Sequence, residues 1–448
     1  MRKNQCGGDE LNEQVKQVIA KHLDEREENR AKWLRAACRN PDNCLALGAY
    51  GDSIKQYFED FRNLSYINTS KVKRIGAPSE NGFIIELPVT KNGYTAYTVL
   101  KSAAEEDADN LMYEYIVGKK FINSKIHAVP TFLETYDLYE YVDEQAYEDV
   151  RKAATQNKLN TLDIRTKIRR LDFDMDTMNL SSMVAQACTK NKLICILIQH
   201  FDHFQTVDSR FDTNKSYDNF RGDISTTLLQ VYFTLAGLRD KYTHYDLHSN
   251  NVMLYKPFEG NACILMRYHA LPDKVIEFKT EYIAKIIDYG RNYFKTEDNL
   301  TTRDVLNQVC KESSCDPNCG EDVGFANIIG SVDGYDVSNY HWIDPSISNQ
   351  SHDLRFAYCV ENRVPGLFVP YTIVYKETTG TPENLTSNLS TTKNINNVVD
   401  MATVTIAKLL NGGSSSNQAK YKDWKVVATM DVYTGGKPYK FQLLPATP

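Results

Sequence analysis

Apolar residues in this chain recur either at helical spacing or in short strand-like runs, which together predict a mixed α+β fold. Residues 9–38 are rich in strong helix formers, and their apolar positions fall near helical spacing. We expect an amphipathic helix that packs on the main body. The alternative is a helix that binds a partner or a second copy of the chain; packing on the body is favoured because the apolar stripe lapses across residues 24–30.

The next part of the chain is typical of strands, with glycines at a turn. Residues 71–90 form two short runs around Gly76 and Gly82, which predicts a β-hairpin, and a third run ends at Lys101. The pattern then predicts a helix over 104–122, a strand over 129–142, a charged and partly helical insertion over 143–192 and a buried strand over 193–201.

The second half begins with a long helix and ends with a hairpin. The predicted elements are a helix over 224–242, a hairpin over 263–278, a strand and turn over 282–294, a helix over 351–360, a helix over 398–410 and a short hairpin around Gly435 and Gly436. Residues 295–350 are polar and irregular, and a loop of that length in a compact domain is usually functional or mobile.

Charge and composition exclude several classes of protein. The 52 basic and 58 acidic side chains give a net charge of −6, which does not favour a general nucleic-acid binder, because such proteins concentrate positive charge on one face. No apolar run reaches about 18 residues, so we expect no membrane span. The first residues lack the apolar segment of a secretory signal. We therefore expect a reducing compartment and free thiols for the ten cysteines.

One cluster of cysteines is a candidate metal site. Cys310, Cys315 and Cys319 are spaced C-x4-C-x3-C, which differs from the paired units of zinc sites. A fourth ligand would have to come from further along the chain. Loop cysteines without a metal are the favoured interpretation.

Three segments carry groups that suit phosphoryl transfer. In the first, Asp246 is followed five residues later by Asn251, on a loop after a predicted helix. An Asp there can orient an attacking hydroxyl and accept its proton, and an Asn can hold a metal ion that also contacts phosphates. In the second, Asp288 follows an apolar strand and offers the hard oxygen ligand that Mg²⁺ prefers.

The third segment joins Lys101 to Glu114, which lies thirteen residues later in a predicted helix. An ammonium group attracts phosphate oxygens, and a carboxylate from a neighbouring helix would fix its direction. Each of these short patterns arises easily by chance. Their order along the chain, from the glycine-containing hairpin to the D-x-G at 288–290, is the order expected of one fold.

In this order, and in the motifs THYDLHSNNVMLY, VIEFKTEYIAKIIDYGRNYF and SHDLRF, the chain resembles the eukaryotic-type protein kinase superfamily. More narrowly, it is similar to the divergent serine/threonine kinases encoded by large DNA viruses. The resemblance covers roughly residues 70–360. It implies a bilobal α+β fold, with a helical extension over 1–62, a small β-rich lobe over 63–201 that includes the insertion, and a mainly helical lobe over 202–448 with a trimmed C-terminal part.

The resemblance implies chemical roles for five residues. Asp246 corresponds to the catalytic base of the family, and Asn251 and Asp288 correspond to its metal-holding residues. Lys101 corresponds to the lysine that holds the nucleotide phosphates, and Glu114 to the helix residue that pairs with it.

Further positions correspond to nucleotide-contacting and structural parts of the family. Gly76 and Gly82 match the glycine-rich lid over ATP, and Gln199 and Phe201 fall where the adenine-contacting hinge is expected. Asp353 matches a buried Asp that braces the catalytic loop through its backbone amides.

The chain also departs from the family pattern. Pro78 stands where a middle glycine would let the backbone approach phosphate. Tyr245 replaces the Arg of H-R-D, so activation through a phosphorylated loop residue that pairs with that Arg is not expected. His248 replaces the Lys that is usual in serine/threonine kinases, and this form occurs in small-molecule kinases of the superfamily. No clear A-P-E follows Asp288, and residues 342–346 are a loose substitute.

The resemblance implies an ATP-dependent serine/threonine protein kinase that uses Mg²⁺, with Mn²⁺ as an alternative ion. Its partners would be ATP and a protein substrate, with a further partner on the N-terminal helix, and its location would be the host cytoplasm, at the virus factory, or the virion. Two alternatives remain: a small-molecule phosphotransferase of the same fold, and a catalytically inactive scaffold or virion component.

Overall fold

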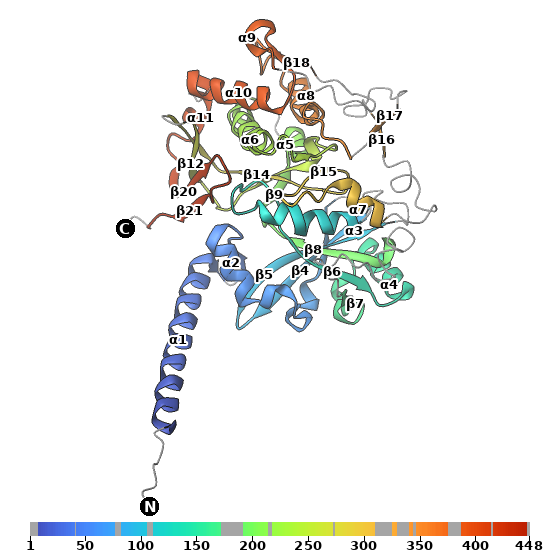
Figure 1. Ribbon diagram of the computed structural model, residues 1–448, viewed down its shortest axis with the longest axis vertical. Helices are drawn as coiled ribbons and strands as arrows, with labels where there is room; N and C mark the ends of the chain where they lie inside the picture. The colour runs from blue at the N-terminus through green and yellow to red at the C-terminus, as the bar shows by residue number, and fades with distance from the viewer. Residues whose placement is uncertain are drawn as a thin grey trace, which may run out of the picture.

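The chain folds into a mixed α+β structure with several sheets (Figure 1). The structure is a computed structural model that describes residues 8–40, 42–76, 82–104, 111–171, 191–213, 217–271, 274–309, 325–328, 340–343, 346–374, 387–413 and 415–445. A six-stranded sheet lies in the middle of the molecule, and helices and smaller sheets from the second half of the chain lie on one side of it (Figure 1).

The six-stranded sheet is antiparallel between all neighbours. Its strands, in spatial order, are β3 (Lys73–Ile75), β4 (Gly82–Lys91), β5 (Tyr94–Ala103), β8 (Ile194–Gln199), β6 (Thr135–Tyr141) and β7 (Ile168–Arg170). The predicted hairpin and the buried strand over 193–201 are confirmed by this pairing. Gly82 is the first residue of β4. A Cβ at this position would lie 2.5 Å from the carbonyl oxygen of Ser102, so only glycine allows the two backbones to approach so closely.

The predicted helix over 104–122 lies on this sheet in shortened form. Helix α3 (Leu111–Ile116) continues into a wide helical turn over Val117–Phe121, and residues 105–110 lie outside the described residues. All six side chains of α3 are buried, including Glu114. A carboxylate in that position needs a cationic partner, because an isolated buried charge is very costly.

The insertion over 143–192 is partly integrated into the fold. Helix α4 (Glu144–Thr155) begins at Asp143, whose side chain accepts from the backbone N–H of Ala146. The short strand β7 then pairs with β6 and forms one edge of the six-stranded sheet. Residues 172–190 lie outside the described residues.

The second half of the chain is built around a buried helix, α6 (Tyr217–Gly237), which packs against α10 (Val398–Lys408) and α11 (Ser415–Lys420). The other helices are α5 (Val207–Thr213), α7 (Thr302–Val309), α8 (Arg355–Arg363) and α9 (Leu389–Thr392). The predicted helices over 224–242, 351–360 and 398–410 are confirmed as elements, with shifted ends. Residues 295–350 contain α7 and a strand pair, so the expectation of an irregular stretch is wrong there.

Short strands complete this part. They are β9 (Phe204–Thr206), β10 (Tyr242–Thr243), β11 (Val252–Tyr255), β14 (Ile283–Ile286), β15 (Tyr293–Phe294), β16 (Phe325–Ile328), β17 (Tyr340–Ile343), β18 (Thr372–Ile373) and β19 (Asn394–Ile395). The pair formed by β11 and β14 is antiparallel, with Val252 opposite Ile286, and it therefore brings the segments after Asp246 and before Asp288 together.

Both predicted hairpins exist, and they join into one sheet. Strands β12 (Ala262–Leu271) and β13 (Lys274–Thr280) form one hairpin, and β20 (Lys425–Tyr433) and β21 (Lys440–Leu443) form the other. Strand β12 pairs with β20 in parallel, which gives the order β13-β12-β20-β21. The sequence pattern predicts each hairpin but not this pairing, because partner choice between distant strands leaves no local signal.

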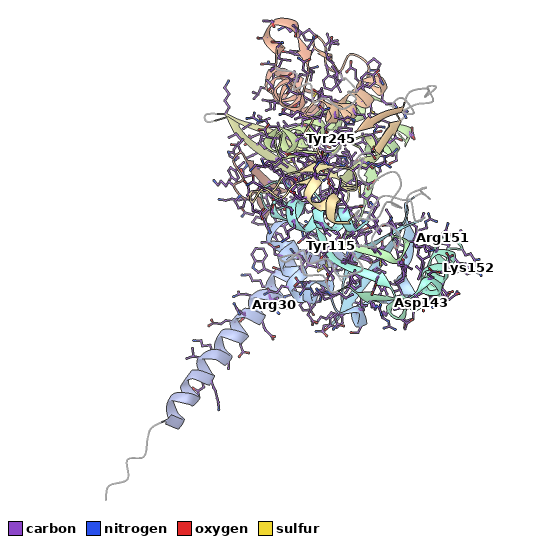
Figure 2. The ribbon with its side chains drawn as sticks, turned by 45° about the vertical axis from the view of Figure 1, so that its right-hand side comes forward. Arg30, Tyr115, Asp143, Arg151, Lys152 and Tyr245 are labelled. Atoms are coloured by element: carbon purple, nitrogen blue, oxygen red, sulfur yellow. A yellow bond between two sulfur atoms is a disulfide. The ribbon has the colours of Figure 1, made fainter. Side chains whose placement is uncertain are left out.

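The N-terminal helix forms as predicted, but most of it does not pack on the body. Helix α1 (Gly8–Ala37) extends away from the molecule and meets the body near its C-terminal end, beyond Arg30 (Figures 1 and 2). Leu34 and Ala37 are buried there, whereas Val18 is 56% exposed. The expectation of a packed helix is therefore wrong for most of its length, because the helix leaves the body well before its N-terminal end.

The free-thiol expectation is also wrong for one pair. Cys38 and Cys44 form a disulfide that joins β1 (Cys38–Asn40) to β2 (Asn43–Cys44) at the end of α1. The two cysteines lie six residues apart, on a turn that brings the strands face to face. Cys195, Cys263 and Cys359 are free and buried among the described residues.

The segment after the disulfide connects distant parts of the chain. Ala46 accepts a hydrogen bond from the side chain of Gln199, at the end of β8, over 2.9 Å. Gly48, the first residue of α2 (Gly48–Tyr57), donates its N–H to the Tyr439 hydroxyl at 2.8 Å. The rings of Tyr50 and Phe441 also meet edge to face. The segment after the disulfide therefore meets the C-terminal hairpin beside the end of β8.

We predict that Tyr439→Phe lowers the free energy of unfolding by about 1 kcal/mol, because the partly buried N–H of Gly48 loses its acceptor. Tyr433→Phe is the matched control: its ring contacts with His269 and Lys437 would persist, so a change within about 0.5 kcal/mol is expected. Urea unfolding of both variants measures the difference. Equal effects would contradict the assigned hydrogen bond.

Candidate active site

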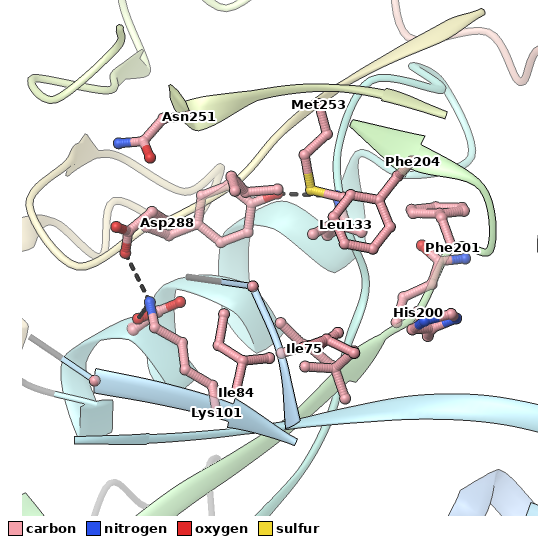
Figure 3. Close-up of a pocket in the computed structure, with 18 of the residues that line it drawn as sticks. Ile75, Ile84, Lys101, Leu133, His200, Phe201, Phe204, Asn251, Met253 and Asp288 are labelled. Atoms are coloured by element: carbon pink, nitrogen blue, oxygen red, sulfur yellow. Dashed lines mark hydrogen bonds and ion pairs between the residues drawn. The ribbon is translucent and has the colours of Figure 1, made fainter. Parts of the chain in front are cut away.

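A cavity of about 300 Å³ lies between the six-stranded sheet and the part of the fold that carries α6. Its walls are mostly apolar, with a few polar groups gathered at one end (Figure 3). The lining includes eight of the nine residues that the sequence analysis assigned to a site: Gly76, Gly82, Lys101, Glu114, Gln199, Phe201, Asn251 and Asp288. An apolar cavity with a few convergent polar groups is the usual form of a small-molecule site.

Lys101 is the centre of the polar end. Its Nζ lies 2.7 Å from Glu114 Oε2 and 2.7 Å from Asp288 Oδ1. The three groups come from β5, from α3 and from the residue segment after β14, so the pairing ties three elements together. The Lys101 side chain is 17% exposed, that of Glu114 is 4% exposed and that of Asp288 is 31% exposed, so the pair with Glu114 is buried and the pair with Asp288 is partly open.

These ion pairs set the charges of the cavity. Burial alone would raise the pKa of Asp288, but the Lys101 ammonium, with smaller contributions from His244 and Arg291, lowers it to about 2. Burial likewise opposes the charge on Lys101, and the two carboxylates outweigh it and raise its pKa. Asp288 is thus an anion, and Lys101 a cation, over the physiological pH range.

The loop over residues 244–251 lies beside this end of the cavity, and Asp353 holds its backbone in place. Asp353 Oδ2 accepts the backbone N–H of His244 at 2.8 Å, and Oδ1 accepts that of Tyr245 at 3.0 Å. The expected contact of Asp353 with backbone amides is confirmed. Burial raises the pKa of Asp353 to about 6, against the opposing effects of His244 and the two N–H donors.

His244 joins this loop to the segment before Asp288. The N–H of Asp246 donates to His244 Nδ1 at 3.3 Å, which assigns the ring hydrogen to Nε2, and Nε2 donates to the carbonyl oxygen of Ile287 at 2.9 Å. Tyr245 and Asp288 have φ values of 62° and 71°, which non-glycine residues rarely adopt. Such strained backbone persists only where the surrounding structure over-determines it, and it clusters at functional sites.

Asp246 stands at the margin of the cavity rather than in its lining. Asn251 links the two, because its Nδ2 donates to the backbone oxygen of Asp246 at 2.8 Å and lies 3.4 Å from its carboxylate Oδ2. The amide oxygen of Asn251 therefore points away from Asp246. Asn251 and Asp288 lie on the same side of the cavity (Figure 3).

The donor set suits a hard divalent cation such as Mg²⁺. Asn251 offers an amide oxygen, and Asp288 offers a carboxylate that stays ionised and uses only Oδ1 for Lys101 in the contacts above. Mg²⁺ is commonly held by one or two such groups together with substrate phosphates. Among the described residues, no group of three or more His, Cys, Asp or Glu side chains is placed to hold a metal. Cys310, Cys315 and Cys319 lie outside the described residues.

The other end of the cavity is mostly apolar. Phe201, Phe204 and Met253 lie there, with His200 beside Phe201 (Figure 3). The Gln199 side chain is committed elsewhere: its Nε2 donates to Ala46, and its Oε1 accepts the N–H of Glu134. The backbone N–H of Gln199 also donates to the oxygen of Glu134, at 2.8 Å.

The two glycines lie at the wall of the cavity. Gly76 has φ of 74° and Gly82 begins β4, and both belong to the lining. Residues 77–81, including Pro78, lie outside the described residues.

Two further side chains shape the site without having been predicted. Lys285 is buried and donates to the backbone oxygens of Pro130 and Phe132, and burial lowers its pKa to about 7. The guanidinium of Arg355, at the start of α8, contacts Asp246 Oδ1 at 3.0 Å. Nothing in local spacing indicates that Arg355 reaches a residue 109 positions earlier.

Comparisons with protein-family models and with curated protein sequences find no match to this chain. In the part of the chain that the structure describes, no helix has the length and apolar character needed to cross a membrane.

We predict that Lys101→Met costs about 3 kcal/mol of unfolding free energy at pH 7.5, because it leaves Glu114 and Asp288 facing each other without a cation. The cost should shrink at pH 5. In the wild type, the lowered pKa of Asp288 contributes stability that is lost only as the pH falls toward 2. In the variant no cation offsets burial, so we expect the pKa values of Glu114 and Asp288 to rise. Folding then favours the protonated carboxyl groups, and the variant loses stability as the pH rises from 5 to 7.5.

Lys73→Met is the matched control, since Lys73 pairs with Glu86 at 3.1 Å in the same sheet but is 58% exposed. Its cost should stay below about 1 kcal/mol and vary little between the two pH values. Chemical unfolding at pH 5 and pH 7.5 decides the matter, and a pH-independent cost for Lys101→Met would contradict the assigned charges.

Proposed function

We propose that this protein is an ATP-dependent phosphotransferase of the protein kinase-like type, which transfers the γ-phosphoryl group to Ser or Thr hydroxyls of protein substrates. The observation that carries the proposal is the pairing of Lys101 with both Glu114 and Asp288 at the polar end of a mostly apolar cavity. An apolar end suits a nucleobase, and a fixed ammonium beside an ionised carboxylate suits a triphosphate with its metal ion. The bilobal reading of the fold belongs to the same proposal.

Each residue has a task that follows from its position. Lys101, held by Glu114, would contact phosphate oxygens as a point charge. Asp288 and Asn251 would hold Mg²⁺, which neutralises charge on the phosphates when it is bound. Asp246 would orient the acceptor hydroxyl and accept its proton.

The reaction balances with these groups alone. The acceptor oxygen forms a bond to the γ-phosphorus while the bond from that phosphorus to the β–γ bridging oxygen breaks. ADP leaves with the bonding electron pair, and the hydroxyl proton passes to Asp246. Since little covalent chemistry is asked of the protein, positioning and charge stabilisation supply the rate.

A small-molecule acceptor is the second candidate, and His248 favours it. This residue stands two positions after Asp246, its side chain is 24% exposed, and its Nε2 lies 3.7 Å from Asp246 Oδ1. It would therefore border the acceptor, where serine/threonine kinases usually carry a lysine. Transfer of label from ATP to proteins or to metabolites of a lysate separates the two.

We predict that Asp288→Ala lowers Mg²⁺-dependent phosphoryl transfer at least about a thousandfold, because a metal ligand and the partner of Lys101 are both lost. The fold should persist, since Lys101 keeps Glu114. ATP consumption and self-phosphorylation of the purified full chain, with and without Mg²⁺, measure the loss.

Glu277→Ala is the control, because Glu277 is an exposed carboxylate on β13, outside the cavity. It should leave turnover unchanged. Undiminished turnover in Asp288→Ala would refute the role of Asp288. A wild-type chain that gains thermal stability from ATP and Mg²⁺ but transfers nothing would refute catalysis and favour a scaffold.

A further inference from the structure

The loop that holds Asp246 lacks a dependable cation of its own. Between residues 244 and 251 the ionisable side chains are His244, Tyr245, Asp246 and His248, and none of them is a lysine or an arginine. Burial, aided by the nearby Arg355, lowers the pKa of His248, while Asp246, Asp288 and Asp208 oppose the shift. His248 is therefore neutral at pH 7, and its ring cannot supply a permanent positive charge to Asp246.

A cation reaches Asp246 from another element. Arg355 is the first residue of α8, and its Nη1 lies 3.0 Å from Asp246 Oδ1. The Arg355 side chain is 11% exposed and that of Asp246 is 19% exposed, so the pair is largely screened from water. A hydrogen bond between two ionised groups in such surroundings is strong and directional.

The backbone that carries Arg355 is fixed by hydrogen bonds on both sides of this residue. Two residues before it, Asp353 accepts two backbone N–H groups from the 244–251 loop. Two residues after it, the N–H of Ala357 donates to the Tyr232 hydroxyl at 2.9 Å, and that hydroxyl donates to the backbone oxygen of Asp353 at 2.9 Å. Because α8 and the loop are joined by these buried bonds, the backbone of Arg355 cannot shift relative to Asp246 without breaking them.

We propose that Arg355 is the positioning residue for Asp246, and that this arginine from α8 replaces a cation within the loop. The proposal rests on the proposed function. Asp246 Oδ1 is held by Arg355, and Oδ2 lies 3.4 Å from the Asn251 amide, so the carboxylate plane is fixed from two sides. A base held in one orientation transfers a proton without first reorganising.

Arg355 also supplies the permanent positive charge beside Asp246. The charged and titratable groups around Asp246 are Arg355 from α8, His244 and His248 from its own loop, Asp288 from the segment after β14 and Asp208 from α5. Two of these are carboxylates, which repel the carboxylate of Asp246. An arginine stays charged at every working pH, so it offsets them without titrating.

We predict that Arg355→Ala lowers kcat about a hundredfold and leaves the KM for ATP within about twofold, because the base and not the nucleotide loses its partner. Arg355→Lys should retain most of the activity. Arg239→Ala, which removes a 55% exposed surface arginine, should change nothing.

A second variant separates positioning from folding. His248→Lys in the Arg355→Ala background returns a cation to the side of Asp246 from within the loop, 3.7 Å away in the present arrangement. It should recover at least about tenfold of the lost kcat while the KM for ATP stays within about twofold. If Arg355 were only structural, His248→Lys would give no such rescue.

The outcomes separate the two proposals. A wild-type chain that binds no ATP and transfers no phosphoryl group overturns the proposed function and this inference together. An active wild type whose Arg355→Ala variant keeps its kcat overturns this inference alone. So does an Arg355→Ala variant that loses activity and is not rescued by His248→Lys.

Discussion

The buried ammonium of Lys101 is the interaction on which the site depends. It neutralises two carboxylates that otherwise could not share a low-dielectric space, Glu114 from α3 and Asp288 from the segment after β14. Because each carboxylate belongs to a different element, the same charge that holds the cavity together also sets the position of α3 against the sheet. The geometry therefore couples the local electrostatics of the cavity to the arrangement of the elements around it.

A second set of bonds fixes the elements around the 244–251 loop, which lies beside the polar end of the cavity. Asp353 holds the backbone of the 244–251 loop, Tyr232 holds α8, and Arg355 projects from α8 onto Asp246. Buried polar groups that are fully satisfied rigidify their surroundings, whereas a single missing partner is costly. This loop thus draws its rigidity from a helix that begins more than a hundred residues later, and its departures from the common motif, Tyr245 and His248, are understood in that setting.

The segments at the periphery of the molecule are held by other contacts than the ion pairs of the cavity. Helix α1 joins the body at its C-terminal end, where the disulfide between Cys38 and Cys44 follows it, and Gly48 in the next segment contacts Tyr439, just before β21. These contacts hold the segment after the disulfide and the C-terminal hairpin beside the end of β8, next to the cavity. The extension is therefore part of the frame around the site, although its first helix stands free of it (Figure 1).

The sequence by itself determined most elements and most of the site. Periodicity located the hairpins, the buried strand β8 and helices α6 and α10, since these signals are local, and motif order selected eight residues that line one cavity. Tertiary structure alone decided the parallel pairing of β12 with β20, the free course of α1, the disulfide and the contact of Arg355 with Asp246. Each of these features depends on contacts between residues that are far apart in the chain or that follow no local pattern. The sequence pattern therefore leaves several possible partners open, and only the packing of the whole chain selects one of them.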